Sequence, residues 1–137
     1  MKNVFLVILL LVFVIGCKTN RKHNGFRQGK WITYDSINGD YYKYIEKYKN
    51  DEEVKTWKTF KNKKLYKKEI HIRNISYITY YNEAKKVVVR GQSKYEKNSK
   101  LIHWFYFGDW NYYNQNGELI LTRKYENGEI QSEIEIK

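Results

Sequence analysis

The strongest constraint on the fold is a set of Asn-Gly pairs that lie between runs of aromatic and β-branched residues. Two of them, Asn116-Gly117 and Asn127-Gly128, fall within residues 108–130. Such a pair predicts a tight type I′ hairpin turn, because both central residues of that turn need a positive φ. This stretch is therefore expected to form three strands joined by two turns, and its weaker upstream copies predict an all-β, antiparallel meander of β-hairpin repeats.

The repeat is recognised by a Gly-x-Trp-x-x-Tyr pattern followed by a turn glycine. It occurs at residues 29–34 and again at residues 108–113. Large aromatic side chains of this kind favour a pleated surface and supply much of the area that a thin sheet can bury. We interpret the following as structural repeat positions: Gly29, Trp31, Tyr34, Gly39, Trp57, Gly108, Trp110, Tyr113, Gly117, Tyr125 and Gly128.

Two further copies are weaker. One covers residues 54–60 around Trp57, with a turn at 61–64 and a return strand at 65–73. The other, residues 78–87, aligns without gaps on residues 110–119, with Ile78 in the Trp position and Lys85 in that of Gly117. The spacing between copies is irregular, which indicates a degenerate repeat rather than a regular solenoid.

The remaining segments give four more expectations. Residues 51–59 are the only ones that could hold a short helix, and the polar residues 91–100 are expected to be a connection. Residues 101–107 form the most apolar stretch outside the N-terminus, which predicts a central strand covered on both faces. Isoleucines alternate with glutamates in residues 129–136, which predicts a half-buried strand.

The N-terminus has the layout of an export signal. Lys2 precedes an unbroken apolar run over residues 4–15. That run is shorter than the roughly 20 residues of a membrane-spanning helix, but it suits the hydrophobic part of a signal peptide. Gly16 and Cys17 follow, and this arrangement resembles the lipobox of a bacterial lipoprotein. The resemblance implies cleavage between Gly16 and Cys17 and a diacylglyceryl group on the Cys17 sulfur. The alternative is an uncleaved N-terminal anchor with an incidental cysteine.

These features divide the chain into three parts. Residues 1–16 are expected to be the signal peptide, residues 17–24 a flexible tether with lipidated Cys17, and residues 25–137 the β-repeat domain. Cys17 is the only cysteine, so no disulfide can form within the chain. The protein is thus predicted to be lipid-anchored to a bacterial membrane. The absence of an acidic run after Cys17 favours the periplasmic side.

Residues 108–128 resemble the MORN-repeat variants of bacterial proteins, many of which belong to the YwqK type of antitoxin component. The matching pattern is Gly-x-Trp-x-Tyr-Tyr-x-x-Asn-Gly-x-Leu, followed by Tyr-x-Asn-Gly. Residues 29–39 match less closely, and the copies together cover about half of the chain after Cys17. The resemblance implies a twisted antiparallel sheet, repeat residues that are not catalytic, and binding to another protein. A lipid-anchored, exported chain would not act beside a cytoplasmic toxin.

Charge is unevenly distributed. The formal net charge is +11, whereas Asp109 and the residues after it carry three positive and six negative side chains. A basic body with an acidic end suggests an anionic partner or head-to-tail association, although a lysine-rich proteome would give the same composition. The basic run at residues 61–68 would indicate nucleic acid in a cytoplasmic protein. Export excludes that partner and leaves lipid phosphates or a solvated sheet face.

Catalytic and metal-binding patterns are weak. The three histidines, His23, His71 and His103, have no accompanying cysteine or second histidine at metal-ligand spacing. No recognisable catalytic context surrounds the pair Ser99 and His103 or the pair Glu69 and Asp109. The sequence also contains no nucleophile elbow and no phosphate-binding loop. We therefore expect no catalytic residues, no metal and no cofactor.

Three functions remain open. The leading hypothesis is a non-enzymatic protein-interaction module in the cell envelope, which binds another envelope protein. The alternative is a binder of anionic glycan or lipid headgroups through a basic, Tyr-rich sheet face. An enzyme is the third, and a concave pocket that holds His71 or His103 beside a carboxylate would favour it.

Overall fold

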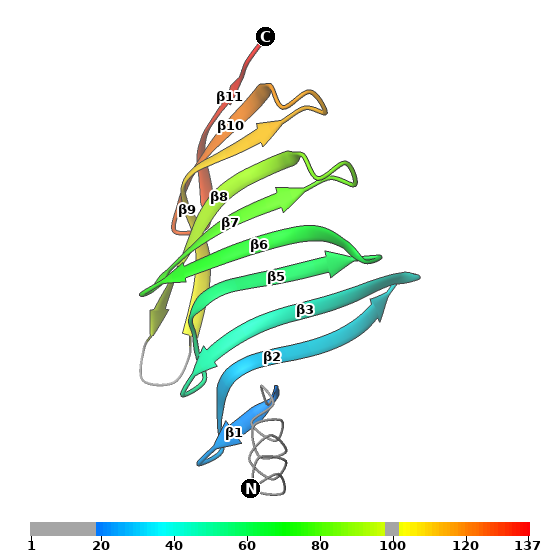
Figure 1. Ribbon diagram of the computed structural model, residues 1–137. Helices are drawn as coiled ribbons and strands as arrows, with labels where there is room; N and C mark the ends of the chain where they lie inside the picture. Colours follow the sequence, from blue (N-terminus) through cyan, green and yellow to red (C-terminus); the bar gives the residue numbers. More distant parts are fainter. Residues whose placement is uncertain (1–18, 98–101) are drawn as a thin grey trace, which may run out of the picture.

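The chain forms one antiparallel sheet in which successive strands are neighbours (Figure 1). The structure, a computed structural model, describes residues 19–97 and 102–137. The strands are β1 (Arg21–His23), β2 (Phe26–Ile37), β3 (Asp40–Lys49), β4 (Glu52–Glu53), β5 (Lys55–Lys61), β6 (Lys64–Ile72), β7 (Ile75–Tyr81), β8 (Val87–Lys97), β9 (Ile102–Tyr113), β10 (Leu119–Glu126) and β11 (Glu129–Glu135). Only the short β4 leaves the path, pairing with β3. The predicted all-β meander is confirmed.

Of the three Asn-Gly pairs that end in the repeat glycines Gly39, Gly117 and Gly128, two form type I′ turns. Asn38-Gly39 has φ values of 52° and 85°, and Asn127-Gly128 has 50° and 87°. A third turn of this kind, Asn24-Gly25 with 50° and 82°, joins β1 to β2. Strand β1 therefore lies inside the segment that was expected to be a flexible tether, and the ordered sheet begins before residue 25.

No helix of the described residues is long and apolar enough to cross a membrane.

The turn at Asn116-Gly117 is longer than predicted. Tyr113 pairs with Leu119, so five residues lie between the paired strands, and only Gly117 takes a positive φ, of 90°. The Oδ1 atom of Asn114 accepts hydrogen bonds from the backbone N–H groups of Asn116 (2.9 Å) and Glu118 (3.0 Å). These bonds satisfy polar backbone groups within the loop, which a two-residue turn would not require.

The Gly-x-Trp motif marks a left-handed residue two positions before the tryptophan. Gly29 and Gly108 have φ values of 70° and 65°, and Lys55, which precedes Trp57, has 62°. The copy around Trp57 thus keeps the backbone shape of the motif without its glycine. Ile78 takes the tryptophan position in the third copy and is 7% exposed.

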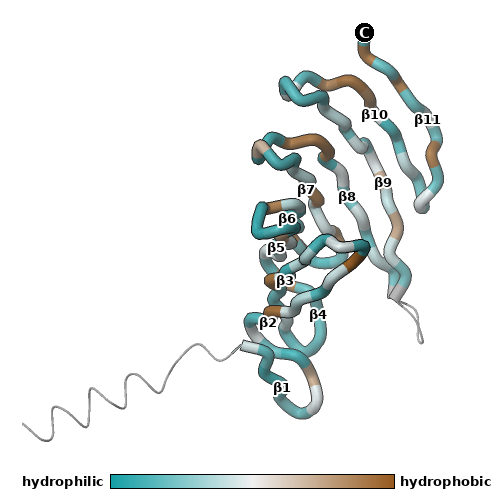
Figure 2. The backbone as a smooth tube through the Cα atoms, turned by 90° about the vertical axis from the view of Figure 1, so that its right-hand side faces the viewer, coloured by the Kyte–Doolittle hydropathy of each residue, from teal (hydrophilic) through white to brown (hydrophobic). Residues whose placement is uncertain are grey.

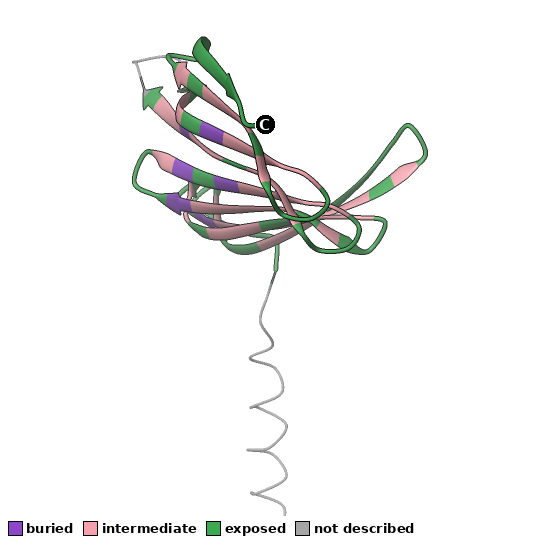
Figure 3. Cartoon of the chain, turned by 90° about the horizontal axis from the view of Figure 1, so that it is seen from above, coloured by how far each residue is buried: buried purple, intermediate pink, exposed green. Residues whose placement is uncertain are grey.

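The sheet curls strongly along its length, as the view from above shows (Figure 3). The rings of His71 on β6 and Trp104 on β9 have centroids 6.2 Å apart. In a flat sheet their strands would be separated by three spacings of about 4.8 Å. The face on which these rings meet is the inner face, and it contains Tyr44, Glu46, Trp57, Thr59, Glu69, His71, Ser76, Ile78, Tyr80, Ser93, Trp104 and Tyr106.

A chain of aromatic contacts on the inner face takes the place of a second layer. It leads from Trp31 through Tyr48, Trp57 and His71 to Trp104, with ring centroids 4.5–6.2 Å apart. Apolar side chains elsewhere occur in short stretches, such as the starts of β8 and β10 (Figure 2). Among hydrophobic side chains of the described residues, Tyr48, Ile78, Phe105 and Trp110 are the buried ones.

Three expectations about the second half of the chain are wrong. The polar residues 91–100 are not a simple connection, since β8 continues to Lys97. Strand β9 is not covered on both faces, because the described residues form a single sheet and Tyr106 is 41% exposed. Strand β11 is exposed rather than half-buried, because it lies at the edge of the sheet. A fourth expectation, which concerns the first half of the chain, is also wrong, because residues 51–59 contain β4 and part of β5 instead of a helix.

Candidate functional site

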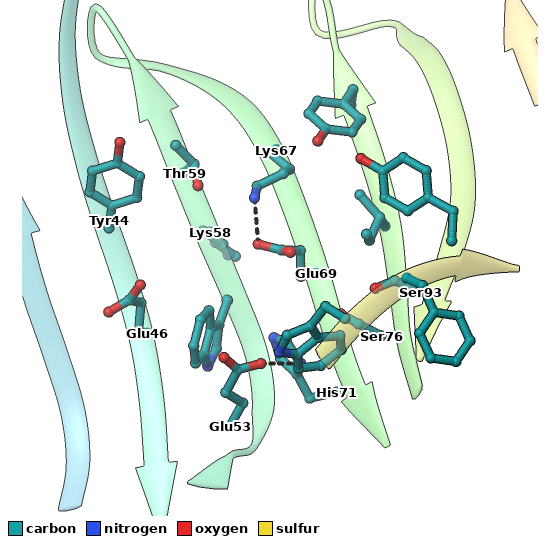
Figure 4. Close-up of a pocket in the computed structure, with 16 residues that line it drawn as sticks. Tyr44, Glu46, Glu53, Lys58, Thr59, Lys67, Glu69, His71, Ser76 and Ser93 are labelled. Atoms are coloured by element: carbon teal, nitrogen blue, oxygen red, sulfur yellow. Dashed lines mark ion pairs between the residues drawn. The ribbon is translucent and has the colours of Figure 1, made fainter. Parts of the chain in front are cut away.

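The curl of the sheet creates a pocket on the inner face, with a volume of about 350 Å³ (Figure 4). This size falls within the usual range for small-molecule sites. Its walls are largely aromatic, with Tyr44, Trp57, Tyr80, Trp104 and Tyr106 contributed by four different strands. We call this hollow the inner-face pocket.

Glu53, His71 and Ser76 form the polar end of the inner-face pocket. The Oε2 atom of Glu53, on β4, lies 3.5 Å from Nδ1 of His71, and Ser76 is the direct cross-strand neighbour of His71. His71 is 9% exposed and Ser76 is 1% exposed. Within residues 19–97 and 102–137, neither the two ring nitrogens of His71 nor the Ser76 hydroxyl has a hydrogen-bond partner. Buried polar groups without partners are unusual and suggest a functional cause.

Negative side chains collect in the inner-face pocket although the chain as a whole is basic. Glu46, Glu53 and Glu69 line it, and Lys67 forms an ion pair with Glu69 at 2.8 Å. Burial, followed by repulsion from Glu69 and Glu46, raises the pKa of Glu53 to about 7. Burial also lowers the pKa of His71, which favours a neutral imidazole.

Glu53, His71 and Ser76 are the residue types of a hydrolytic triad, and a histidine beside a carboxylate is the arrangement that would favour an enzyme. Catalysis would require the serine hydroxyl to bond to the imidazole and to face the substrate. The Ser76 hydroxyl is instead enclosed and makes no such bond. The arrangement therefore offers a binding site more readily than a nucleophile.

The other residues considered for chemistry lie apart from this pocket. His103 is exposed and stacks on Phe105 with centroids 5.8 Å apart, His23 is exposed on β1, and Asp109 is exposed on β9. Of the described residues, no three His, Cys, Asp or Glu side chains are placed to hold a metal ion. Ser99, Gly16 and Cys17 lie outside the described residues.

The tryptophans and two of the tyrosines among the repeat residues make contacts within the sheet. Trp57 lines the inner-face pocket, and its Nε1–H donates to the carbonyl of Lys47 at 2.9 Å. Trp110 makes the corresponding bond to the carbonyl of Gln92 at 3.1 Å. Trp31 has a buried Nε1 without a partner. Tyr125 packs against Trp110, and Tyr113 closes the loop before β10.

Sequence patterns did not identify Glu53, Ser76 or Trp104 as site residues. Glu53 lies on a two-residue strand with no periodicity of its own. Trp104 reaches the pocket only because the sheet curls, and curl depends on many small twists rather than on a local motif. Alternation of Ser76, Ile78 and Tyr80 along β7 was the one signal that could have placed Ser76 on this face.

The outer face of the sheet, opposite the pocket, is basic. Lys30 pairs with Lys47 across β2 and β3, and Lys58 pairs with Lys68 across β5 and β6. Like charges in directly opposed positions destabilise a sheet. Lys43 also lies over the ring of Tyr34, with its Nζ atom 5.8 Å from the centroid.

The two edges of the sheet differ. At the β2 edge, the Asn20 side chain bonds to the backbone N–H and carbonyl of Ile32, at 2.7 and 2.9 Å. Strand β11 pairs only with β10, and its Ile130 and Ile134 are 51% and 61% exposed. The β11 edge therefore offers a free row of backbone donors and acceptors within the described chain.

Comparison of the chain with models of protein families, with curated proteins and with solved structures found no significant match.

Proposed function

We propose that this protein is a lipoprotein, anchored to a bacterial membrane through Cys17 and facing the periplasm, that acts as a non-enzymatic protein-interaction module. The observation that carries the proposal is the open β11 edge. Natural proteins usually protect sheet edges with charged side chains, above all lysine, with proline or with a covering segment. Strand β11 has glutamates but no lysine or proline, whereas at the opposite edge the Asn20 side chain bonds to the backbone of β2.

The partner is an extended segment of another envelope protein that adds a strand beside β11. In such complexes the backbone bonds supply affinity and alternate side chains supply specificity. Glu129, Glu133 and Glu135 make this edge acidic, and Arg123 pairs with Glu133 from the neighbouring strand. A segment with alternating basic and apolar residues would complement the glutamates and cover Ile134.

Site-specific photo-crosslinking in membranes tests this proposal. A crosslinking residue at Ile134 should yield one defined adduct, and the same residue at Tyr77 is the control because Tyr77 is 45% exposed on the outer face of β7. The adduct should contain a second membrane-associated protein. It should disappear when the Ile136→Lys change is added to the crosslinking variant. An adduct of twice the chain mass would instead show self-association. Equal yields from both positions would contradict docking at β11.

A second candidate function is favoured by the opposed lysine pairs of the outer face. The pairs Lys30–Lys47 and Lys58–Lys68 would be relieved by a polyanionic ligand, such as an anionic glycan or lipid headgroup. Each lysine near an anionic membrane surface is worth about 1 kcal/mol. The basic, tyrosine-containing outer face would then bind the polyanionic ligand, and the inner-face pocket would face away from that ligand.

Vesicle binding at several salt concentrations tests the second candidate. Binding of a Cys17→Ser chain to vesicles with anionic lipid should weaken steeply with salt, because exposed charges are screened over about 10 Å at 0.1 M. Replacing Lys58 and Lys68 by glutamine should reduce it more than replacing Lys22 and Lys137. Binding that is equally strong on neutral vesicles would contradict the candidate.

A further inference from the structure

We propose that the inner-face pocket binds the primary ammonium group of an organic cation, with the Glu53 carboxylate as its counter-ion beside the His71 ring. The inference concerns a different surface from the β11 edge. Either proposal can therefore fail without the other.

The first argument is the charge of the inner-face pocket. Glu46, Glu53 and Glu69 line it together with two lysines. Lys67 already contacts Glu69 at 2.8 Å, and the strand register places the Lys58 side chain on the outer face, opposite Lys68. Arg27, on the neighbouring β2, is bound to Asp51 at 2.9 Å. Among the described residues, Glu53 therefore has no lysine or arginine partner, although the chain has a net charge of +11. A bound cation would supply the missing charge.

The second argument is independent of the carboxylates. The His71 side chain is 4% exposed and lines the pocket, and neither of its ring nitrogens has a hydrogen-bond partner in the part of the chain that the structure describes. A neutral imidazole has one nitrogen with a free lone pair, which accepts a hydrogen bond from an N–H donor. Its Nδ1 lies 3.5 Å from Glu53 Oε2, so small side-chain movements would allow one ammonium group to contact both. An ammonium group has three donors to share.

The third argument comes from the aromatic walls. The Trp57 and Trp104 rings flank His71, with centroids 4.5 and 6.2 Å from the imidazole. Tyr44 and Tyr80 also line the pocket. Aromatic faces attract cations, and their apolar surface accommodates the alkyl chain that carries the ammonium group. This combination suits an alkylammonium better than a hydrated metal ion.

The test uses butylammonium as probe and butanol as its neutral match, with the full chain in a nonionic detergent. Binding is followed by NMR at the indole N–H signals of Trp57 and Trp104. Butylammonium should bind about tenfold more tightly than butanol. Tetramethylammonium, which has no N–H donor, should bind less tightly than butylammonium. Equal affinities for butylammonium and butanol would overturn the proposal.

Two charge-matched variants locate the site. Glu53→Gln should weaken butylammonium binding about tenfold, whereas Glu126→Gln removes the same charge from an exposed position on β10 and should leave binding unchanged. Equal weakening by both variants would indicate general surface attraction and overturn the site. Unchanged indole signals without ligand show that Glu53→Gln has kept the fold.

A binding experiment with peptides distinguishes two sources of the ammonium group. Acetyl-Gly-Lys-Gly-amide presents a lysine side chain, and its glutamine analogue is the neutral control. If the lysine peptide binds as tightly as butylammonium, the pocket accepts a side chain of a partner protein. If butylammonium binds and the peptide does not, the ligand is a free amine. If neither shows an advantage over its neutral control, the proposal is wrong.

Discussion

Lys85 occupies in the β7–β8 loop the left-handed backbone position that Gly117 occupies in the β9–β10 loop, with φ values of 63° and 90°. Both loops are closed by an asparagine at the same position. Asn82 accepts a bond from the Lys86 N–H at 3.0 Å, as Asn114 does from Glu118. The two hairpins thus share a backbone, although one has lost the glycine that relieves its strain.

Lys85→Gly should therefore stabilise the protein by about 0.5–1 kcal/mol, because a side chain in the left-handed region is strained. The reciprocal change Gly117→Lys should destabilise it by a similar amount. Denaturant unfolding of both variants and the wild type measures the difference. Stabilisation by Gly117→Lys would show that the loops are not equivalent.

Gly91 provides space for Trp110. A Cβ atom at Gly91 would come within 2.0 Å of the Trp110 ring, which is 3% exposed. Gly91→Ala should therefore destabilise the protein by about 1–3 kcal/mol, the usual cost of overpacking. Combining it with Trp110→Leu, which makes room for the methyl group, should cost less than the sum of the two single changes. Additive costs in this double-mutant cycle would contradict the contact.

Trp57 and Trp31 provide a matched pair for the indole hydrogen bond. Trp57→Phe removes the bond from Nε1 to the Lys47 carbonyl, whereas the Nε1 atom of Trp31 has no partner. Trp57→Phe should cost about 1 kcal/mol more than Trp31→Phe, which is the typical net value of one hydrogen bond. Thermal and denaturant unfolding of the two variants provide the comparison, and a larger loss for Trp31→Phe would refute it.

Glu53 should make stability depend on pH. Its pKa is raised from an ordinary 4.5 to about 7, so the folded state holds a proton that the unfolded state releases. Its contribution therefore becomes unfavourable as pH rises from 4.5 to 7 and stays so above pH 7. Glu53→Gln should be close to neutral near pH 4 and stabilising by roughly 1–2 kcal/mol at pH 8, after allowance for solvent screening.

Unfolding of wild type and Glu53→Gln at each pH isolates this contribution. The difference between the two proteins largely cancels the opposite effect of His71, whose lowered pKa reduces stability below pH 6.5. A difference that does not change between pH 4 and 8 would mean that Glu53 titrates normally.

Local sequence signals predicted the strands and most turns because the relevant physics is local. Asn38-Gly39 and Asn127-Gly128 take positive φ values as such pairs do in type I′ turns, and the alignment of Lys85 with Gly117 anticipated their shared conformation. The same signal occurs at Asn24-Gly25, where it crosses the boundary between the expected tether and the expected domain. The long turn at Asn116-Gly117 differed because Asn114 bonds to the loop backbone.

The inner-face pocket was not predictable in the same way. Glu53, His71 and Trp104 come from β4, β6 and β9, and their contact depends on the cumulative curl of the strands between them. Periodicity shows which residues share a face, but it does not show how far that face bends. The exposure of Ile134 likewise follows from the position of β11 at the sheet edge, which its alternating pattern does not reveal.

The proposal that this sheet acts from a membrane is tested most directly by intact-mass analysis and fractionation of wild type and Cys17→Ala. Wild type should be membrane-bound, should begin at Cys17 and should carry the added mass of its acyl groups. Cys17→Ala should lack that mass and remain uncleaved. A soluble, unmodified wild-type chain would contradict the anchor, and with it the exclusion of nucleic acid and of a cytoplasmic partner.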